Sequence, residues 1–261
     1  MPEALVTSER QCEVLIARLN RPEHGNAINL ELAQALAVVV ADCKADRRLR
    51  AFIITGTGAR FFCSGGDVKA YAQVESAAEL NRIFNLIRAL LDAIEALPCP
   101  VIAAINGYAV GGGAELALAC DLRVMDHAAQ IGFPQSRLGI IPGWDGIERL
   151  AALTGRAAAT RLLLTGTRIN ADAALACNLI DEIAPQGESL TRALALALTF
   201  TETAPLSLAA IKTALRNTPH HDPKAARQTT RDAFAHLWFT ADHKEAERAF
   251  AEKRKPQFSG T

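Results

Sequence analysis

The hydrophobic positions of this chain form short runs and helical repeats in alternation. Apolar runs bounded by turn residues are typical of buried strands, and they occur at Val14–Leu19, Ala51–Thr55, Val101–Ile105 and Leu122–Met125. Apolar residues three or four positions apart predict amphipathic helices over 30–43 and 80–94, and Pro98 and Pro100 end the second. The alternation of strands and helices indicates an α/β fold.

The pattern changes after Gly187. A last strand is predicted over Leu179–Ile183, and beyond Gly187 only helical repeats remain, at Leu190–Phe200, Leu206–Arg216, Lys224–Trp238 and Asp242–Glu252. We therefore predict a mixed α/β domain over residues 1–200 and an all-helical region over 201–261. His220 and His221 lie between prolines. Adjacent histidines cannot both face one ion from a regular element, so we interpret the pair as a surface loop.

The stretch Asn106–Asp121 (NGYAVGGGAELALACD) follows a predicted buried strand and carries three consecutive glycines before a small-residue helical run. The first N–H groups of a helix have no internal partners and lie at the positive end of its dipole. Such a strand, glycine turn and helix can hold a phosphate or a developing oxyanion. Glu115 lies in the first helical turn and faces that position. A tight turn with a solvated glutamate explains the same residues equally well.

A second glycine turn, Ser64-Gly65-Gly66-Asp67, follows the aromatic pair Phe61-Phe62. Alone it is compatible with a plain loop. The two turns lie about 45 residues apart, and one oxyanion needs donors from two directions. Together the turns therefore indicate a two-amide oxyanion site.

Composition narrows the class of protein. Hydrophobic residues make up 50% of the 261 residues, and 28 basic residues balance 28 acidic ones. This is a globular composition, and no basic excess indicates a nucleic-acid partner or an anionic membrane surface. The six cysteines lack metal-site spacing and are interpreted as reduced core residues, so no metal is predicted. No signal-like start and no apolar run of 18 residues is found, so we expect a cytoplasmic protein without a membrane partner.

The combined motifs resemble the enoyl-CoA hydratase/isomerase family, the crotonase superfamily, almost from end to end. The resemblance is carried by Leu19–Pro22 with Asn26–Ile28, Phe62–Lys69, Asn106–Asp121, Phe133–Pro134, Leu138–Gly143, Asp242–Ala246 and Glu252–Pro256. It implies an α/β crotonase-like spiral of ββα units with a C-terminal α-helical trimerisation region. It also implies an acyl-CoA thioester as ligand, a homotrimer or homohexamer, and no separate cofactor, because coenzyme A is part of the substrate.

The family's functional residues match particular positions of this chain. The resemblance implies that the backbone amides of Gly66 and Gly112 stabilise a thioester enolate and that Glu115 transfers the proton. It places the CoA moiety beside Glu23, His24, Gly25, Ala27, Ser64, Gly66, Asp67, Val68 and Lys69. It places the acyl group beside Tyr108, Val110, Pro134 and Leu138, with Gly112 of the oxyanion site also among the binding residues.

One departure from the family pattern affects the chemistry. Gln135 stands where the hydratases carry their second catalytic glutamate, and an amide holds water but transfers no proton. Asp145 stands where the family usually has a small residue. It is either a second acid or, with Glu148, a capping box for the helix that follows.

Three functions remain open after this departure. The first is an enoyl-CoA hydratase (a lyase) or isomerase working with Glu115 alone or with Asp145. The second is another enolate reaction, such as decarboxylation or thioester hydrolysis. The third is a CoA-ester-binding protein without turnover, against which the retained glycines and Glu115 argue.

Overall fold

The computed structural model describes residues 4–72, 74–217 and 223–261, so the predicted loop at His220 and His221 lies outside the described residues. Its larger sheet has six strands in the order β1-β2-β3-β5-β7-β10. All neighbours in it are parallel except β1 and β2, which form an antiparallel hairpin. The strands are β1 Val6–Gln11, β2 Val14–Leu19, β3 Ala51–Gly56, β5 Val101–Ile105, β7 Leu122–Asp126 and β10 Glu182–Ala184.

The smaller sheet lies beside the first and has the order β4-β6-β8-β9. Its strands are β4 Phe61–Cys63, β6 Tyr108–Val110, β8 Gln130–Gly132 and β9 Arg168–Asn170. The pairs β3–β4, β5–β6 and β7–β8 each give one strand to each sheet before the chain enters a helix. Those helices are α3 Ala77–Glu95, α4 Gly112–Leu118 and α5 Gly146–Thr165. This repetition confirms the predicted spiral of ββα units.

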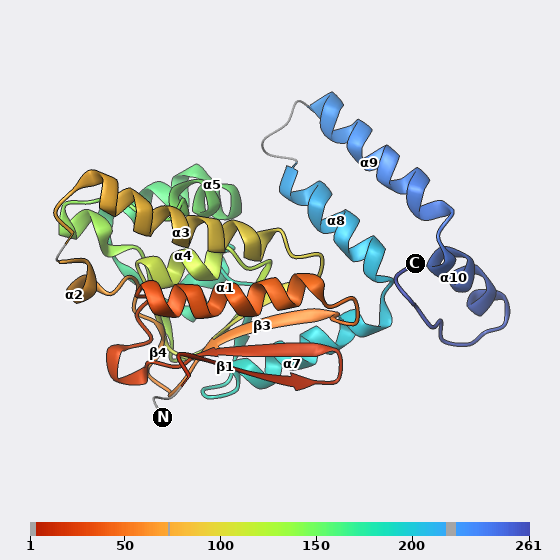
Figure 1. Ribbon diagram of the computed structural model, residues 1–261, viewed down its shortest axis with the longest axis horizontal. Coiled ribbons are helices and arrows are strands. Elements are labelled where there is room, and N and C mark those ends of the chain that lie inside the picture. The colour runs from red at the N-terminus through yellow and green to blue at the C-terminus, as the bar shows by residue number, and fades with distance from the viewer. Residues whose placement is uncertain (1–3, 73, 218–222) are drawn as a thin grey trace.

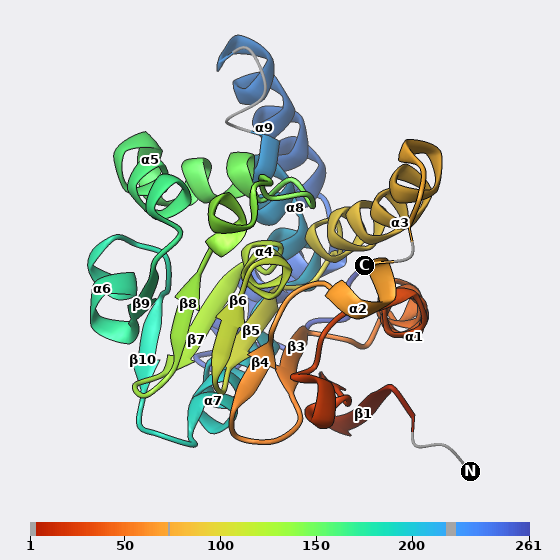
Figure 2. The same ribbon diagram turned by 90° about the vertical axis from the view of Figure 1, so that its left-hand side faces the viewer.

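Helices cover both faces of the larger sheet (Figures 1 and 2). The helix α7 Ser189–Thr199 packs its alanines against Ile16, Ile53 and Ile102 on one face. The helices α1 Leu30–Ala45, α3 and α4 pack on the other, against residues such as Ile54. A parallel sheet buried on both faces needs apolar residues at successive positions. That requirement explains why its strands were recognisable as continuous runs.

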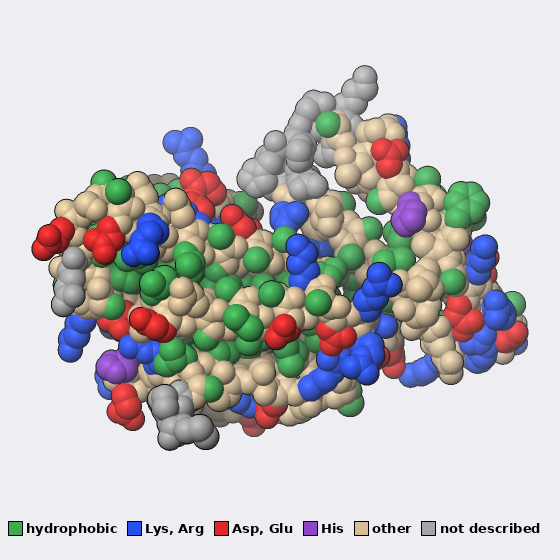
Figure 3. Space-filling model, in the orientation of Figure 1, with side chains coloured by type: hydrophobic (Ala, Val, Ile, Leu, Met, Phe, Trp, Pro, Cys, Tyr) green, Lys and Arg blue, Asp and Glu red, His purple; other side chains and the backbone are tan. Residues whose placement is uncertain are grey.

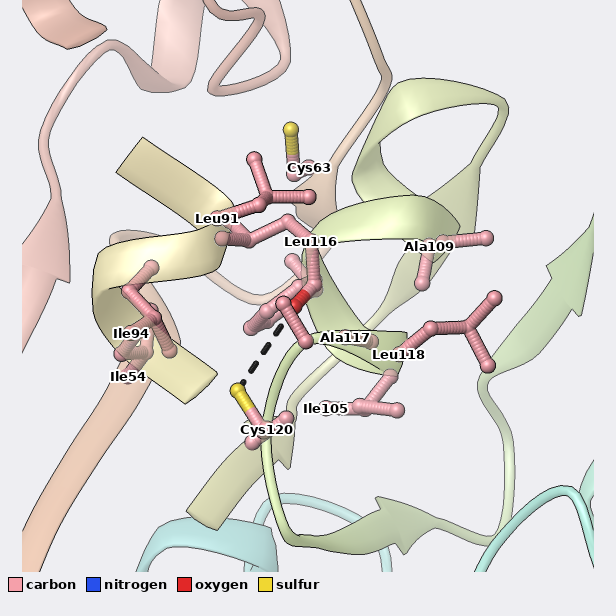
Figure 4. Close-up of a cluster of buried hydrophobic side chains, with 14 of the residues drawn as sticks. Ile54, Cys63, Leu91, Ile94, Ile105, Ala109, Leu116, Ala117, Leu118 and Cys120 are labelled. Atoms are coloured by element: carbon pink, nitrogen blue, oxygen red, sulfur yellow. Dashed lines mark hydrogen bonds between the residues drawn. The ribbon is translucent and has the colours of Figure 1, made fainter. Parts of the chain in front are cut away.

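The helix α4 is fixed in the deepest part of this core. Figure 4 shows its residues Leu116 and Ala117 among Leu91 of α3, Ile105 of β5 and other buried side chains. The Cys120 thiol just beyond the helix donates to the Leu116 carbonyl at 3.6 Å. Close packing of this kind leaves little freedom to move. The start of α4 is therefore held in place relative to both sheets.

The C-terminal helices project away from the spiral (Figure 1). They are α8 Pro205–Asn217, α9 Pro223–Trp238 and α10 Ala241–Ala251. Lys212 ties α8 to the spiral, because its ammonium group lies 2.6 Å from the Asp121 carboxylate and donates to the Cys99 carbonyl. Large apolar side chains nevertheless remain exposed on these helices, namely Ile211, Leu215, Phe234, Trp238 and Phe250, and Phe239 is exposed in the turn between α9 and α10.

A second apolar surface lies between α1 and α3. It is a hollow of about 530 Å³ lined by apolar and mostly small side chains, with Gln34 and Lys44 at its polar positions. Figure 3 shows the hydrophobic side chains that gather along it.

Several short elements depart from the prediction. The strand β1 was not predicted, because five of its six residues are exposed and it lies at a sheet edge. Three-residue strands such as β4 and β6 are too short to show a period. The last strand is Glu182–Ala184 rather than Leu179–Ile183, since Leu179 and Ile180 are buried without joining the ladder. The six cysteines are free, but Cys12 is exposed in the β1–β2 turn and is not a core residue.

In the part of the chain that the structure describes, no single helix is long and apolar enough to cross a membrane. One sharply bent pair, 189–202 with 205–216, reaches the required length and composition.

Candidate active site

The two glycine turns lie next to each other at the carboxyl ends of β4 and β6 in the smaller sheet. They follow β4 and β6, which are parallel neighbours, so both turns emerge at the same end of the strands. A Cβ atom on Gly65 would lie 3.2 Å from the Gly112 nitrogen and 2.9 Å from the Val110 oxygen. Gly65 also has φ +108°, which side chains rarely allow. The two turns that the sequence predicted to form one site therefore lie in contact with each other.

The backbone N–H groups of Gly66 and Gly112 are potential hydrogen-bond donors to a ligand. Both residues are half-buried. Among the described residues, no turn, loop or side-chain hydrogen bond uses either N–H group. Gly112 begins α4, so its N–H also lies at the positive end of that helix. Two such donors on neighbouring turns can stabilise one negatively charged oxygen.

The three glycines of the central motif are required for two different reasons. Gly111 has φ +58° and makes the turn into α4. A Cβ on Gly112 would lie only 2.1 Å from the Trp144 ring, and a Cβ on Gly113 only 2.0 Å from the Cys63 carbonyl oxygen. One glycine is thus required by backbone conformation and two by close approach.

Glu115 is a buried carboxylate beside these turns, with 1% of its surface exposed. Its Oε2 accepts the backbone N–H of Trp144 at 2.9 Å, and its Oε1 accepts the Gln135 side-chain amide at 3.4 Å. Gly146 packs so closely on Glu115 that position 146 must be glycine, because a Cβ there would lie 2.5 Å from the Glu115 Cγ. The carboxylate is therefore fixed from three sides.

The environment of Glu115 shifts its acidity. Burial raises the pKa of Glu115 from 4.5 to about 7, against the lowering effects of the Trp144 N–H and the Arg149 charge. A group with a pKa near neutrality both accepts and releases a proton easily at physiological pH. Glu115 consequently has the environment of a general acid–base residue.

Gln135 presents an unused acceptor next to Glu115. It lies in the 3-10 helix Pro134–Leu138 and is 7% exposed. A Cβ on Gly111 would lie 3.8 Å from its Nε2 atom, so the amide borders the central glycine turn. Within the described residues its Oε1 is buried without a hydrogen-bond partner. A buried oxygen of this kind is expected to accept a hydrogen from water or from a ligand.

The structure corrects the capping prediction for Asp145. This residue has left-handed backbone angles, φ 62° and ψ 29°, and its side chain makes no capping hydrogen bond to α5. An N-cap residue needs extended angles for its carboxylate to reach the next turn, so the predicted box with Glu148 does not form. The Asp145 carboxylate is instead half exposed and lies 3.8 Å from the Arg88 guanidinium.

The two segments predicted to line the CoA moiety lie side by side. The Ser64 N–H donates to the Gly25 carbonyl at 2.9 Å. Arg21 joins the segments further, because it donates to the Ala27 carbonyl and to the Asp67 carboxylate. Asp67 also caps α2, Val68–Tyr71. The side chains left accessible on this surface are Glu23, His24, Val68 and Lys69.

The residues predicted to wall the acyl pocket do not all come together. Val110 contacts Gly65, and Pro134 directly precedes Gln135, whereas Leu138 at the end of the same 3-10 helix is 66% exposed. Tyr108 packs on the Phe61 ring at 5.6 Å, and the Arg168 guanidinium lies over it. Tyr108 lines a surface cavity of about 770 Å³ to which neither Glu115 nor the Gly66 turn contributes.

Sequence reasoning missed the aromatic wall of the site. Trp144 is buried against Gly66 and Gly112, Tyr71 lies against Gly66, and Phe84 packs between the two aromatic rings. The sequence carries one cue for Trp144. A large aromatic side chain close to Gly143 and Gly146 is expected to pack against another segment of the protein. Tyr71 and Phe84 carried no such signal, and only the approach of α2 and α3 to the loop brings them in.

Known proteins resemble this chain in sequence and in fold. A profile of the enoyl-CoA hydratase/isomerase family matches residues 9–261. The 2,3-dehydroadipyl-CoA hydratase of Escherichia coli is 38% identical over 260 residues, with all of both chains covered. The short-chain-enoyl-CoA hydratase of Clostridium acetobutylicum is 33% identical over 251 residues, covering 96% of this chain and 95% of the relative.

A crystal structure of an enoyl-CoA hydratase from Bacillus anthracis superposes with a TM-score of 0.95 at 32% identity. It covers 98% of this chain and 100% of its own. The matches assign the fold to the crotonase class. The chain belongs to the enoyl-CoA hydratase/isomerase family, and it is an acyl-CoA-processing enzyme of the hydratase or isomerase type.

Proposed function

We propose that this protein adds water to a 2-enoyl-CoA thioester with Glu115 as its only proton-transfer residue. The observation that carries the proposal is the buried Glu115 carboxylate with its pKa near 7, set beside two free glycine amides. The thioester carbonyl accepts the N–H groups of Gly66 and Gly112. Each such donor is worth about 3 to 4 kcal/mol of barrier once negative charge collects on the oxygen.

One carboxylate is sufficient to balance the reaction. Ionised Glu115 takes a proton from water while the water oxygen bonds to C3, and the C2–C3 π electrons move through C1 onto the carbonyl oxygen. The neutral Glu115 then returns the proton to C2 as the enolate collapses. The unpartnered Oε1 of Gln135 accepts the second hydrogen of the water and holds it in line.

A second candidate is double-bond isomerisation, which Gln135 favours. Isomerisation moves the double bond from C3–C4 to C2–C3. It needs one base that removes a proton from C2 and returns it at C4, and no water has to be held. A single carboxylate performs both steps, and a glutamine beside it is then only a hydrogen-bonding neighbour. Decarboxylation and thioester hydrolysis also use the oxyanion amides and remain outcomes of the test.

The proposal extends to binding and assembly. The CoA moiety lies along 23–27 and 64–69, where Arg21 joins the two segments. No separate cofactor takes part. The exposed apolar side chains of α8, α9 and α10 are buried against further copies of the chain in a trimer or hexamer.

The test compares wild-type protein with Glu115→Gln on crotonyl-CoA. We expect the wild type to bleach the enoyl absorbance and the variant to be about 10²- to 10⁴-fold slower. Binding of butyryl-CoA, measured by calorimetry, should be nearly unchanged, because the oxyanion donors are backbone groups. Gln135→Glu should raise the hydration rate by about 10-fold or more, since it supplies a second acid–base group.

Other outcomes separate the alternatives. Enoyl absorbance that appears from 3-butenoyl-CoA, without bleaching of crotonyl-CoA, identifies an isomerase. Release of free CoA or of carbon dioxide identifies hydrolysis or decarboxylation. Full activity of Glu115→Gln on crotonyl-CoA contradicts the proposed role of Glu115.

A further inference from the structure

The indole of Trp144 lies across both of the glycines proposed to hold the thioester carbonyl. A Cβ added to Gly112 would lie 2.1 to 2.7 Å from three atoms of its six-membered ring, and one added to Gly66 would lie 3.4 Å from a fourth. The ring is thus in van der Waals contact with both backbone turns. Trp144 is 3% exposed, so this contact is part of a packed interior.

The backbone of the same residue holds the proton-transfer group. The Trp144 N–H donates to the Glu115 Oε2 atom at 2.9 Å. One residue therefore contacts the proposed oxyanion turns with its ring and the proposed acid–base residue with its main chain. An acyl group with its carbonyl at the glycine amides and its C2 and C3 atoms beside Glu115 must run along this residue.

The loop that carries Trp144 is pinned to α3. The Phe84 ring meets the Trp144 ring edge-on, with centroids 6.4 Å apart, and would touch any Cβ on Gly143. Arg88 donates to the Gly143 carbonyl at 2.8 Å and pairs with Asp145. These contacts from one helix oppose outward rotation of the loop. The indole consequently acts as a fixed wall.

Two further aromatic rings pack beside the indole, with Phe84 against Trp144 and Tyr71 against Gly66. The Tyr71 ring is 5.7 Å from Phe84 and is fixed by a hydrogen bond from its hydroxyl to the Ile28 carbonyl. The indole packs against both glycine turns, so each further carbon of an acyl chain laid along it has to displace the ring. Protein interiors resist such overpacking.

We propose that Trp144 closes the acyl pocket and restricts this enzyme to short acyl groups such as crotonyl and butyryl. The inference rests on the proposed function, because it takes the Gly66 and Gly112 amides as the position of the thioester carbonyl. Replacing the indole by a methyl group opens the space between the glycine turns and Phe84 to longer chains.

The test measures binding of saturated acyl-CoA esters, which need no turnover. We expect wild-type protein to bind butyryl-CoA at least as tightly as octanoyl-CoA in calorimetry. In Trp144→Ala the octanoyl ester should bind about 10-fold or more tightly than butyryl, since each methylene buried in an open apolar site strengthens binding about fourfold. Trp144→Phe, which keeps an aromatic ring, should give a smaller preference and serves if the alanine variant does not fold.

The chain offers a matched control, because its second tryptophan, Trp238, lies in α9 and contacts Phe234 and His243. Trp238→Phe should keep the wild-type order of affinities. It also leaves Trp144 as the single tryptophan, whose emission should change on addition of butyryl-CoA and not of free acetate.

Two results separate the inference from the proposed function. If wild-type protein prefers octanoyl-CoA, or if Trp144→Ala leaves the octanoyl-to-butyryl ratio unchanged, the role of Trp144 is wrong while the acyl-CoA site stands. If no ester binds more tightly than CoA alone, the proposed function fails and the inference fails with it.

Discussion

At the scale of single residues, burial distinguishes one carboxylate of the candidate site. Glu115 is held in a dry environment by two donors, and its pKa is raised from 4.5 to about 7. A pKa displaced this far corresponds to about 3 kcal/mol of stability. Burial of this carboxylate therefore lowers the stability of the folded protein at neutral pH.

The raised pKa of Glu115 predicts that wild type and Glu115→Gln differ in stability and that the difference depends on pH. The folded protein binds the Glu115 proton more tightly than the unfolded chain, so wild-type stability falls as pH rises from 4.5 through 7. The variant lacks this loss, and its amide can donate to Gln135 Oε1 while accepting from Trp144. We expect Glu115→Gln to gain up to about 3 kcal/mol relative to wild type between pH 5 and pH 8.

Thermal or urea unfolding of both proteins at the two pH values checks this expectation. All other titrating groups are shared, so the difference between the two curves isolates Glu115. Parallel stability curves would show that the folded pKa of Glu115 is close to 4.5.

At the scale of elements, the loop between the 3-10 helix 134–138 and α5 decides which residues meet. Asp145 has left-handed angles that asparagine also adopts readily, and its pair with Arg88 is half exposed. Exposed pairs contribute about 0 to 1 kcal/mol. Asp145→Asn should therefore change the melting temperature little and retain most of the activity toward crotonyl-CoA.

The matched control is Asp145→Ala, which should cost about 1 to 2 kcal/mol more, because alanine lacks the side chain that makes left-handed angles tolerable. Unfolding measurements and initial rates on the same preparations check both variants. A collapse of the rate in Asp145→Asn at an unchanged melting temperature would identify Asp145 as the second acid.

At the scale of the whole molecule, the C-terminal helices leave apolar surface without a partner in one chain. Phe250 is 88% exposed, Phe239 75% and Leu215 69%. Exposed apolar patches on a protein surface mark interaction sites. We expect light scattering at micromolar concentration to give three or six times the chain mass of 27.9 kDa.

Charged substitutions locate the contact. Phe239→Glu should shift the mass toward that of one chain, whereas Leu164→Glu, at an equally exposed position on α5, should not. A wild-type mass of 27.9 kDa in solution contradicts the proposed assembly.

The sequence by itself determined the features that repeat or that depend on local chemistry. Buried parallel strands need continuous apolar runs, so Val14–Leu19 and Val101–Ile105 were located to the residue. The cap at Asn170 is local in the same way, because its side chain accepts the Ala173 N–H in the first turn of the helix Ala171–Ala176. The glycine turns and Glu115 were found because turn conformations and helix starts are local properties.

The tertiary structure alone decided what those elements bring together. Asp145 matched a capping pattern, but its backbone angles follow from the way the loop packs on α3. The aromatic wall is formed by Tyr71, Phe84 and Trp144, and its first and last residues are more than seventy positions apart in the sequence. A hydrophobic repeat within one helix or strand cannot predict a contact of that kind. Likewise, the pKa of Glu115 depends on burial by distant segments. A sequence specifies each element through its neighbours along the chain, whereas the contents of a site depend on contacts through space.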